Sequence, residues 1–103
     1  MIEIISNDLS ICDGEECYLL FYFTAKWCGP CQRIKPLLQK ISEGSDSSKL
    51  KVYMIDIDEN DEIVKEFQIR SVPTFYLYKK KELIGQTGGG DIKKVQELLK
   101  NMN

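Results

Sequence analysis

Residues 17–31 read Cys-Tyr-Leu-Leu-Phe-Tyr-Phe-Thr-Ala-Lys-Trp-Cys-Gly-Pro-Cys, and this stretch decides the fold. Its first part, Cys17 to Thr24, is a continuous apolar and aromatic run, which is typical of a strand that is covered on both faces. After the Gly29-Pro30 breaker, apolar residues recur at helical spacing from residue 34 to residue 41 and stop at Gly44. The stretch therefore predicts a central strand that leads directly into an amphipathic helix.

The segments on either side of this stretch alternate in the same way. Further strands are predicted at 2–5, 50–57, 72–78 and 83–87, and further helices over 63–67 and 92–99. The last two strands are separated by only four polar residues, which permits an antiparallel hairpin and nothing longer. Residues 6–16 leave room for one or two helical turns. The order predicts an α/β fold, a three-layer α/β/α sandwich around a central mixed β-sheet.

Length, charge and composition exclude several classes of function. The 103 residues are expected to form one domain over 1–103. The net charge is -2, and no basic stripe offers itself to a nucleic acid. No apolar run approaches the roughly 20 residues that span a membrane, and no signal peptide is recognised, so a cytoplasmic location is expected. The chain has no histidine, which removes the usual base of Ser/His/Asp and Cys/His catalysis and all imidazole metal ligands.

The Cys28-x-x-Cys31 pair at the predicted helix start carries the candidate chemistry. Unpaired amide groups and the helix dipole favour a thiolate there, so Cys28 is the expected nucleophile and Cys31 the residue that resolves a mixed disulfide. This interpretation requires the Cys28 thiol to be exposed. Gly29 permits close approach of a substrate backbone, and Pro30 suits a first helical turn. Trp27 is expected to shield the thiolate or guide the substrate rather than to fill the core.

Other roles for the four cysteines remain open on the sequence alone. A zinc site would need four ligands, and the only further candidates are Cys12 and Cys17, whose spacing suits zinc poorly. These two could instead form a second, regulatory disulfide. Free thiols are more common in a reducing compartment, and we expect Cys12 and Cys17 to be unpaired.

Two separate segments resemble the thioredoxin family. The segment Phe21–Cys31 is similar to the active-site signature of thioredoxins, and Ser71-Val72-Pro73-Thr74-Phe75 is similar to the segment that holds the family's cis proline. The resemblance implies that Pro73 is cis and packs beside a Cys28–Cys31 disulfide. It also implies that the Val72 backbone binds an extended substrate peptide and that Gly88 lies at the rim of the substrate groove.

The resemblance implies a thiol-disulfide oxidoreductase that reduces protein disulfides. Its expected partners are protein disulfide substrates and an NADPH-dependent thioredoxin reductase, with no cofactor bound by the domain itself and a monomeric state. Gly-Pro between the cysteines is similar to the reducing members of the family. The alternative is a binding module that uses the same surface while its thiols are incidental.

The chain departs from the family inside the core. Thioredoxins commonly have a buried aspartate where this chain has Tyr22, and a lysine partner where it has Met54. Loss of both charges is physically consistent, because one buried charge left alone costs several kcal/mol. Cys31 must then lose its proton by another route, either to water or to the Tyr22 hydroxyl.

Overall fold

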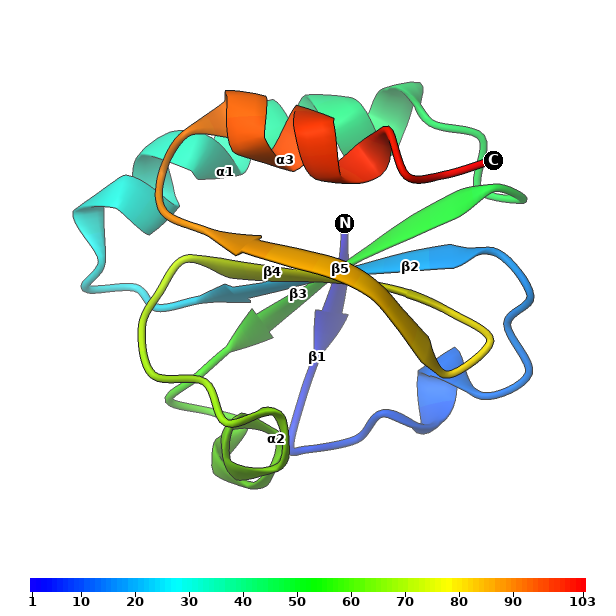
Figure 1. The fold of residues 1–103 in the computed structure, drawn as a ribbon. Coiled ribbons are helices and arrows are strands. Elements are labelled where there is room, and N and C mark those ends of the chain that lie inside the picture. The colour runs from blue at the N-terminus through cyan, green and yellow to red at the C-terminus, as the bar shows by residue number, and fades with distance from the viewer.

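The computed structural model describes all residues from 1 to 103 and contains five strands, three α-helices and one short 3-10 helix. Figure 1 shows the sheet running through the middle of the molecule with helices above and below it. In chain order the elements are β1 (Ile2–Ile4), η1 (Ser10–Cys12), β2 (Tyr18–Thr24), α1 (Gly29–Gly44), β3 (Leu50–Asp56), α2 (Asp61–Phe67), β4 (Thr74–Lys79), β5 (Glu82–Gly88) and α3 (Ile92–Leu99).

The sheet is mixed, as the sequence predicts. Its strand order is β1-β3-β2-β4-β5, with β3 parallel to both β1 and β2, and with β4 antiparallel to both β2 and β5. All seven residues of β2 are buried, which agrees with its uninterrupted apolar sequence. Because β2 is the central strand, the residues that follow it lie at one end of the sheet, near the middle of that edge.

The two faces of the sheet carry separate cores. Helices α1 and α3 cover one face, and α2 with η1 covers the other (Figure 1). Successive side chains of β2 alternate between the faces: Tyr22 belongs to the cluster beneath α1 and α3, while Phe21 and Phe23 belong to the opposite cluster. The three-layer α/β/α arrangement is therefore confirmed.

Most predicted elements are confirmed, with small differences at their ends. The strand predicted at 72–78 begins at Thr74 instead, because Pro73 has no N–H for a ladder hydrogen bond and the preceding residues form a bend. The connection between β4 and β5 is tighter than the four polar residues suggested. Lys80 and Lys81 alone form the turn, both with positive φ, as two-residue hairpins of this kind require.

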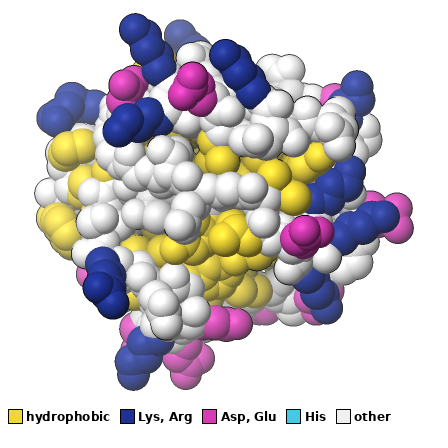
Figure 2. Space-filling view, in the orientation of Figure 1, with side chains coloured by type: hydrophobic (Ala, Val, Ile, Leu, Met, Phe, Trp, Pro, Cys, Tyr) yellow, Lys and Arg dark blue, Asp and Glu magenta, His cyan; other side chains and the backbone are white.

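The face beneath η1 and α2 is incompletely covered. Figure 2 shows hydrophobic side chains gathered between β5 and α2. Phe67, Tyr76, Tyr78 and Leu83 line an open groove there. Tyr76 and Tyr78 pack against Phe67 with ring centroids 5.7 and 5.9 Å away, so both contribute to the packed sheet face.

No helix of the chain has the length and hydropathy needed to cross a membrane.

Candidate active site at the start of α1

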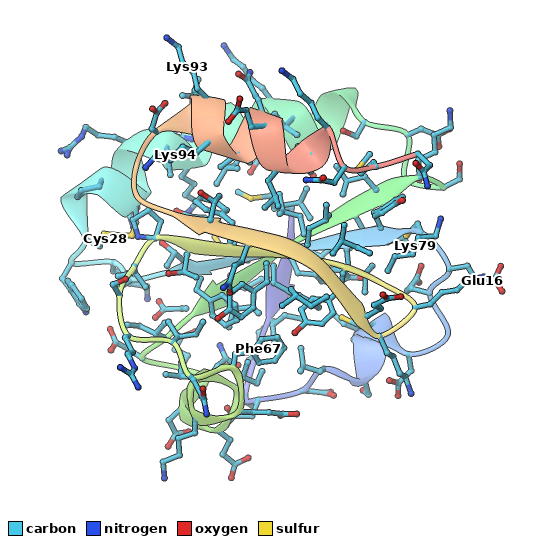
Figure 3. The ribbon with its side chains drawn as sticks, in the orientation of Figure 1. Glu16, Cys28, Phe67, Lys79, Lys93 and Lys94 are labelled. Atoms are coloured by element: carbon cyan, nitrogen blue, oxygen red, sulfur yellow. A yellow bond between two sulfur atoms is a disulfide. The ribbon has the colours of Figure 1, made fainter.

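Cys28 and Cys31 form a disulfide at the junction between β2 and α1. Their Cα atoms are 5.2 Å apart, within the usual range for disulfides. Figure 3 shows Cys28 at the edge of the molecule where α1 begins, far from Phe67. The pair therefore lies at the end of the sheet where the sequence predicts it.

The first turn of α1 is built around the Cys28 sulfur. Cys28 is the N-cap residue, and its Sγ accepts a hydrogen bond from the backbone N–H of Cys31 at 3.2 Å. Pro30 occupies the first turn, where no intrahelical partner is needed for an N–H. A negative charge on Cys28 would meet this N–H and the positive end of the helix dipole, so the geometry stabilises a thiolate there.

The two cysteines differ slightly in their exposure to solvent. Cys28 is 6% exposed and Cys31 is fully buried, with Ala25, Ile57 and Val72 packed around them. The expected exposure of Cys28 is therefore wrong as stated, because its neighbours leave only a small part of the residue open. Cys28 is the only residue of the pair that keeps any exposed surface.

The segment that resembles the cis-proline loop faces the disulfide across space. The Val72–Pro73 peptide bond is cis, and the Val72 carbonyl oxygen lies 3.7 Å from Cys28 Sγ. The Pro73 carbonyl accepts a hydrogen bond from the N–H of Gly89 at 3.0 Å. Gly88 pairs with Thr74 across β4 and β5, so it lies directly beside this loop.

Trp27 lies outside the core and beside the disulfide. It is 69% exposed, and its indole N–H donates a hydrogen bond to an Asp58 carboxylate oxygen at 2.9 Å. Asp58 follows β3, 31 residues further along the chain. Sequence analysis missed Asp58 because the acidic run from 56 to 62 gives no sign of which carboxylate faces the active-site loop.

Gly90 is a second residue that the sequence does not reveal. A Cβ atom at Gly90 would lie 3.1 Å from Pro30 Cβ, closer than ordinary van der Waals contact. The absence of a side chain at Gly90 lets the loop after β5 close against the active-site turn. Only the folded arrangement brings these two loops together.

Tyr22 lies directly behind the active site. Its hydroxyl donates a hydrogen bond to the Cys31 carbonyl at 2.7 Å, and its ring stacks on Phe75 at 5.3 Å between centroids. Burial raises the pKa of Tyr22, although the nearby Thr24 hydroxyl opposes the shift. The Tyr22 hydroxyl therefore stays protonated at neutral pH and cannot be the base that accepts the Cys31 proton. Met54, half-buried, packs against the same cluster.

Cys12 and Cys17 are free thiols, as expected. Burial is the main cause that raises the pKa of both. Cys17 packs in the core beneath η1 and α2, and Cys12 lies half-buried against that core. A raised pKa lowers the thiolate fraction at neutral pH and with it the nucleophilicity of the residue.

The difference in environment between Cys28 and the two free thiols predicts which of them reacts first. In the reduced protein at pH 7, a limiting amount of iodoacetamide should modify Cys28 at least about tenfold faster than Cys12 or Cys17, since a tenfold lower thiolate fraction follows from each unit of pKa. Peptide mapping by mass spectrometry measures the four rates. Equal rates at Cys28 and Cys12 would remove the case for an activated thiol at the start of α1.

Comparisons with known proteins agree with this geometry. The family profile described as Thioredoxin matches residues 8–103. The thioredoxin of Malassezia sympodialis is 37% identical over 83 residues, which cover 81% of this chain and 79% of the relative. The thioredoxin of Porphyra purpurea is 39% identical over 82 residues, which cover 80% and 68%. The crystal structure of the reduced thioredoxin pre-protein of Schistosoma mansoni superposes with a TM-score of 0.89 at 30% identity, covering 99% of this chain and 97% of that one. With its Cys28–Cys31 disulfide at the start of α1, the chain belongs to the thioredoxin family of protein-disulfide oxidoreductases.

Proposed function

We propose that Cys28 is the attacking thiol and Cys31 the resolving thiol in the reduction of protein disulfides. The observation that carries this assignment is the hydrogen bond from the Cys31 N–H to Cys28 Sγ, combined with the complete burial of Cys31. The Cys28 thiolate attacks one substrate sulfur and forms a mixed disulfide, and the second substrate sulfur leaves and takes a proton. Cys31 then loses its proton and attacks Cys28 Sγ, which releases the first substrate sulfur. Two electrons and two protons pass to the substrate, and Cys28 and Cys31 end as a disulfide.

The residues around Cys28 suit a bound peptide. We assign substrate binding to Val72, Pro73 and Gly88, with a further contact from the exposed ring of Trp27, the residue before Cys28. The Val72 carbonyl lies 3.7 Å from Cys28 Sγ, so an extended backbone paired with Val72 would carry its own sulfur to the nucleophile. Gly29 and Pro30 complete the loop, and Gly29 leaves room for the approaching chain.

The partner that restores the dithiol is, in this proposal, an NADPH-dependent thioredoxin reductase. We place the protein in the cytoplasm, because the unpaired Cys12 and Cys17 suit a reducing compartment. We also propose that it acts as a monomer. The Gly-Pro dipeptide between the cysteines favours a reducing role over an oxidising one.

A coupled assay tests this function. With NADPH and a thioredoxin reductase, catalytic amounts of the protein should reduce insulin. The oxidation of NADPH and the precipitation of the insulin B chain measure this reaction. A variant with Cys12→Ser and Cys17→Ala is the matched control and should keep full activity, because both thiols lie outside the site. Failure of the reductase to reduce the protein, together with failure of dithiothreitol-reduced protein to reduce insulin, would refute the proposal.

A further inference from the structure

A small polar cleft opens on the side of the sheet covered by α1, where β2 and β3 end. Its volume is about 160 Å³. We call it the α1 cleft. The residues that line it are Glu3, Thr24, Lys26, Gln32, Lys35, Met54, Asp56 and Glu59.

Two polar groups in the α1 cleft are buried without full compensation by the protein. The Thr24 hydroxyl lies near the Tyr22 hydroxyl but makes no hydrogen bond of good geometry, and Thr24 is only 5% exposed. Asp56 is 8% exposed, and its Oδ1 accepts a single hydrogen bond, from the N–H of Asp58 at 2.9 Å. Thr24 and Asp56 are register partners in β2 and β3, so they lie side by side. Buried polar groups are rarely left unpaired, and a cleft of this size has the room and the polar partners that a bound water needs.

The α1 cleft adjoins the buried end of the active site. Gln32 follows Cys31 directly, and its side-chain amide donates to the Ala25 carbonyl at 2.8 Å. On the other side, Thr24 lies near the hydroxyl of Tyr22, which is itself bonded to the Cys31 carbonyl. The α1 cleft is therefore lined by the residue that follows Cys31 in the first turn of α1.

The chemistry of the proposed function needs a proton acceptor at this position. Cys31 is fully buried, and burial in apolar surroundings disfavours a thiolate, so its attack on Cys28 depends on a base. The Tyr22 hydroxyl is excluded because its raised pKa keeps it protonated.

Five ionisable groups face the α1 cleft. Glu3 of β1 and Glu59 are exposed, Lys35 of α1 is half-buried, and the exposed Lys26 lies 3.6 Å from Glu59. Asp56, at the end of β3, is the only carboxylate among them that is buried. Its side chain therefore lies closest to the interior of the protein among the carboxylates of the cleft.

We propose that Asp56, through water held in the α1 cleft by the Thr24 hydroxyl, accepts the proton that Cys31 loses when it resolves the mixed disulfide. The proton passes from Cys31 Sγ to water and from water to the Asp56 carboxylate, while the Cys31 electron pair forms the bond to Cys28 Sγ. The departing substrate thiolate takes up a proton from solvent, and Asp56 releases its proton to solvent afterwards. This inference rests on the proposed roles of Cys28 and Cys31.

The test separates the two thiol steps with 5,5′-dithiobis(2-nitrobenzoate) in the Cys12→Ser, Cys17→Ala background. Attack by Cys28 releases one coloured thiolate in a first phase, and resolution by Cys31 releases the second. Asp56→Asn should slow the second phase by about 10-fold to 100-fold and leave the first unchanged, because it removes general-base assistance. Without that base, the second-phase rate should follow the thiolate fraction and rise about tenfold per pH unit below the thiol pKa, whereas the wild-type rate should rise less steeply.

Two further variants complete the test. Thr24→Val keeps the shape of the side chain but removes the hydroxyl that holds water, and it should slow the second phase as well; it decides the matter if Asp56→Asn does not fold. Glu59→Gln changes an exposed carboxylate of the same cleft and should change neither phase. An unchanged second phase, or equal slowing of both phases, overturns the role of Asp56. Loss of the first phase in the wild type would instead refute the proposed function of Cys28.

Discussion

The Cys31→Ser variant is expected to remain covalently attached to its substrate through Cys28. The first attack needs only the Cys28 thiolate, which the start of α1 still stabilises, but serine cannot resolve the mixed disulfide. Turnover of insulin should fall to the background of the buffer. Mass spectrometry under non-reducing conditions should detect an adduct that contains one substrate molecule and that dithiothreitol releases.

The Cys28→Ser variant is the matched comparison. It should form no adduct, because the remaining thiol of the pair is fully buried. An adduct at Cys31 in this variant would show that the roles of the two sulfurs are reversed. If the double variant Cys28→Ser, Cys31→Ser kept the full biological activity of the chain, its function would be binding, and electron transfer would be incidental.

The sequence carries the parts of this site that depend on local patterns. The position of Cys28 and Cys31 at a strand-to-helix junction is predicted from the sequence, because hydrophobic periodicity alone locates the end of β2 and the start of α1. The resemblance of Ser71–Phe75 to the cis-proline segment places Val72 and Pro73 opposite them. These expectations needed no knowledge of which strands are neighbours.

The parts that the sequence does not reveal depend on strand register and on loops meeting in space. Thr24 and Asp56 share the α1 cleft only because β2 and β3 pair in one particular register. Asp58 reaches Trp27 across 31 residues of chain. The acidic run from Asp56 to Glu62 predicts a solvated loop and helix cap, yet it contains a buried carboxylate, a partner of the indole and a fully buried asparagine.

That asparagine, Asn60, joins the N-terminal segment to the rest of the fold. Its side-chain amide donates to the carbonyls of Ile4 at 3.2 Å and Asp56 at 2.9 Å, and its Oδ1 accepts from the N–H of Asn7 at 2.8 Å. Asn7 in turn accepts hydrogen bonds from the N–H groups of Glu62 and Ile63 at the start of α2. A single buried side chain thus holds β1, the end of β3 and the cap of α2 together.

Replacing Asn60 with Leu is expected to lower the free energy of unfolding by roughly 3 kcal/mol or more, since the Ile4 and Asp56 carbonyls and the half-buried Asn7 N–H each lose a hydrogen bond and leucine leaves little room for water. Small proteins have only about 5–15 kcal/mol of stability, so the loss is large. With a urea dependence of about 1–3 kcal/mol/M, the unfolding midpoint should fall by at least about 1 M. Asn101→Leu is the control, because Asn101 is exposed and bonds only to the Leu98 carbonyl in the turn after α3, and it should change stability by less than about 0.5 kcal/mol. Equal midpoints for the two variants, both with the Cys28–Cys31 disulfide intact, would show that Asn60 does not hold the N-terminal segment in place.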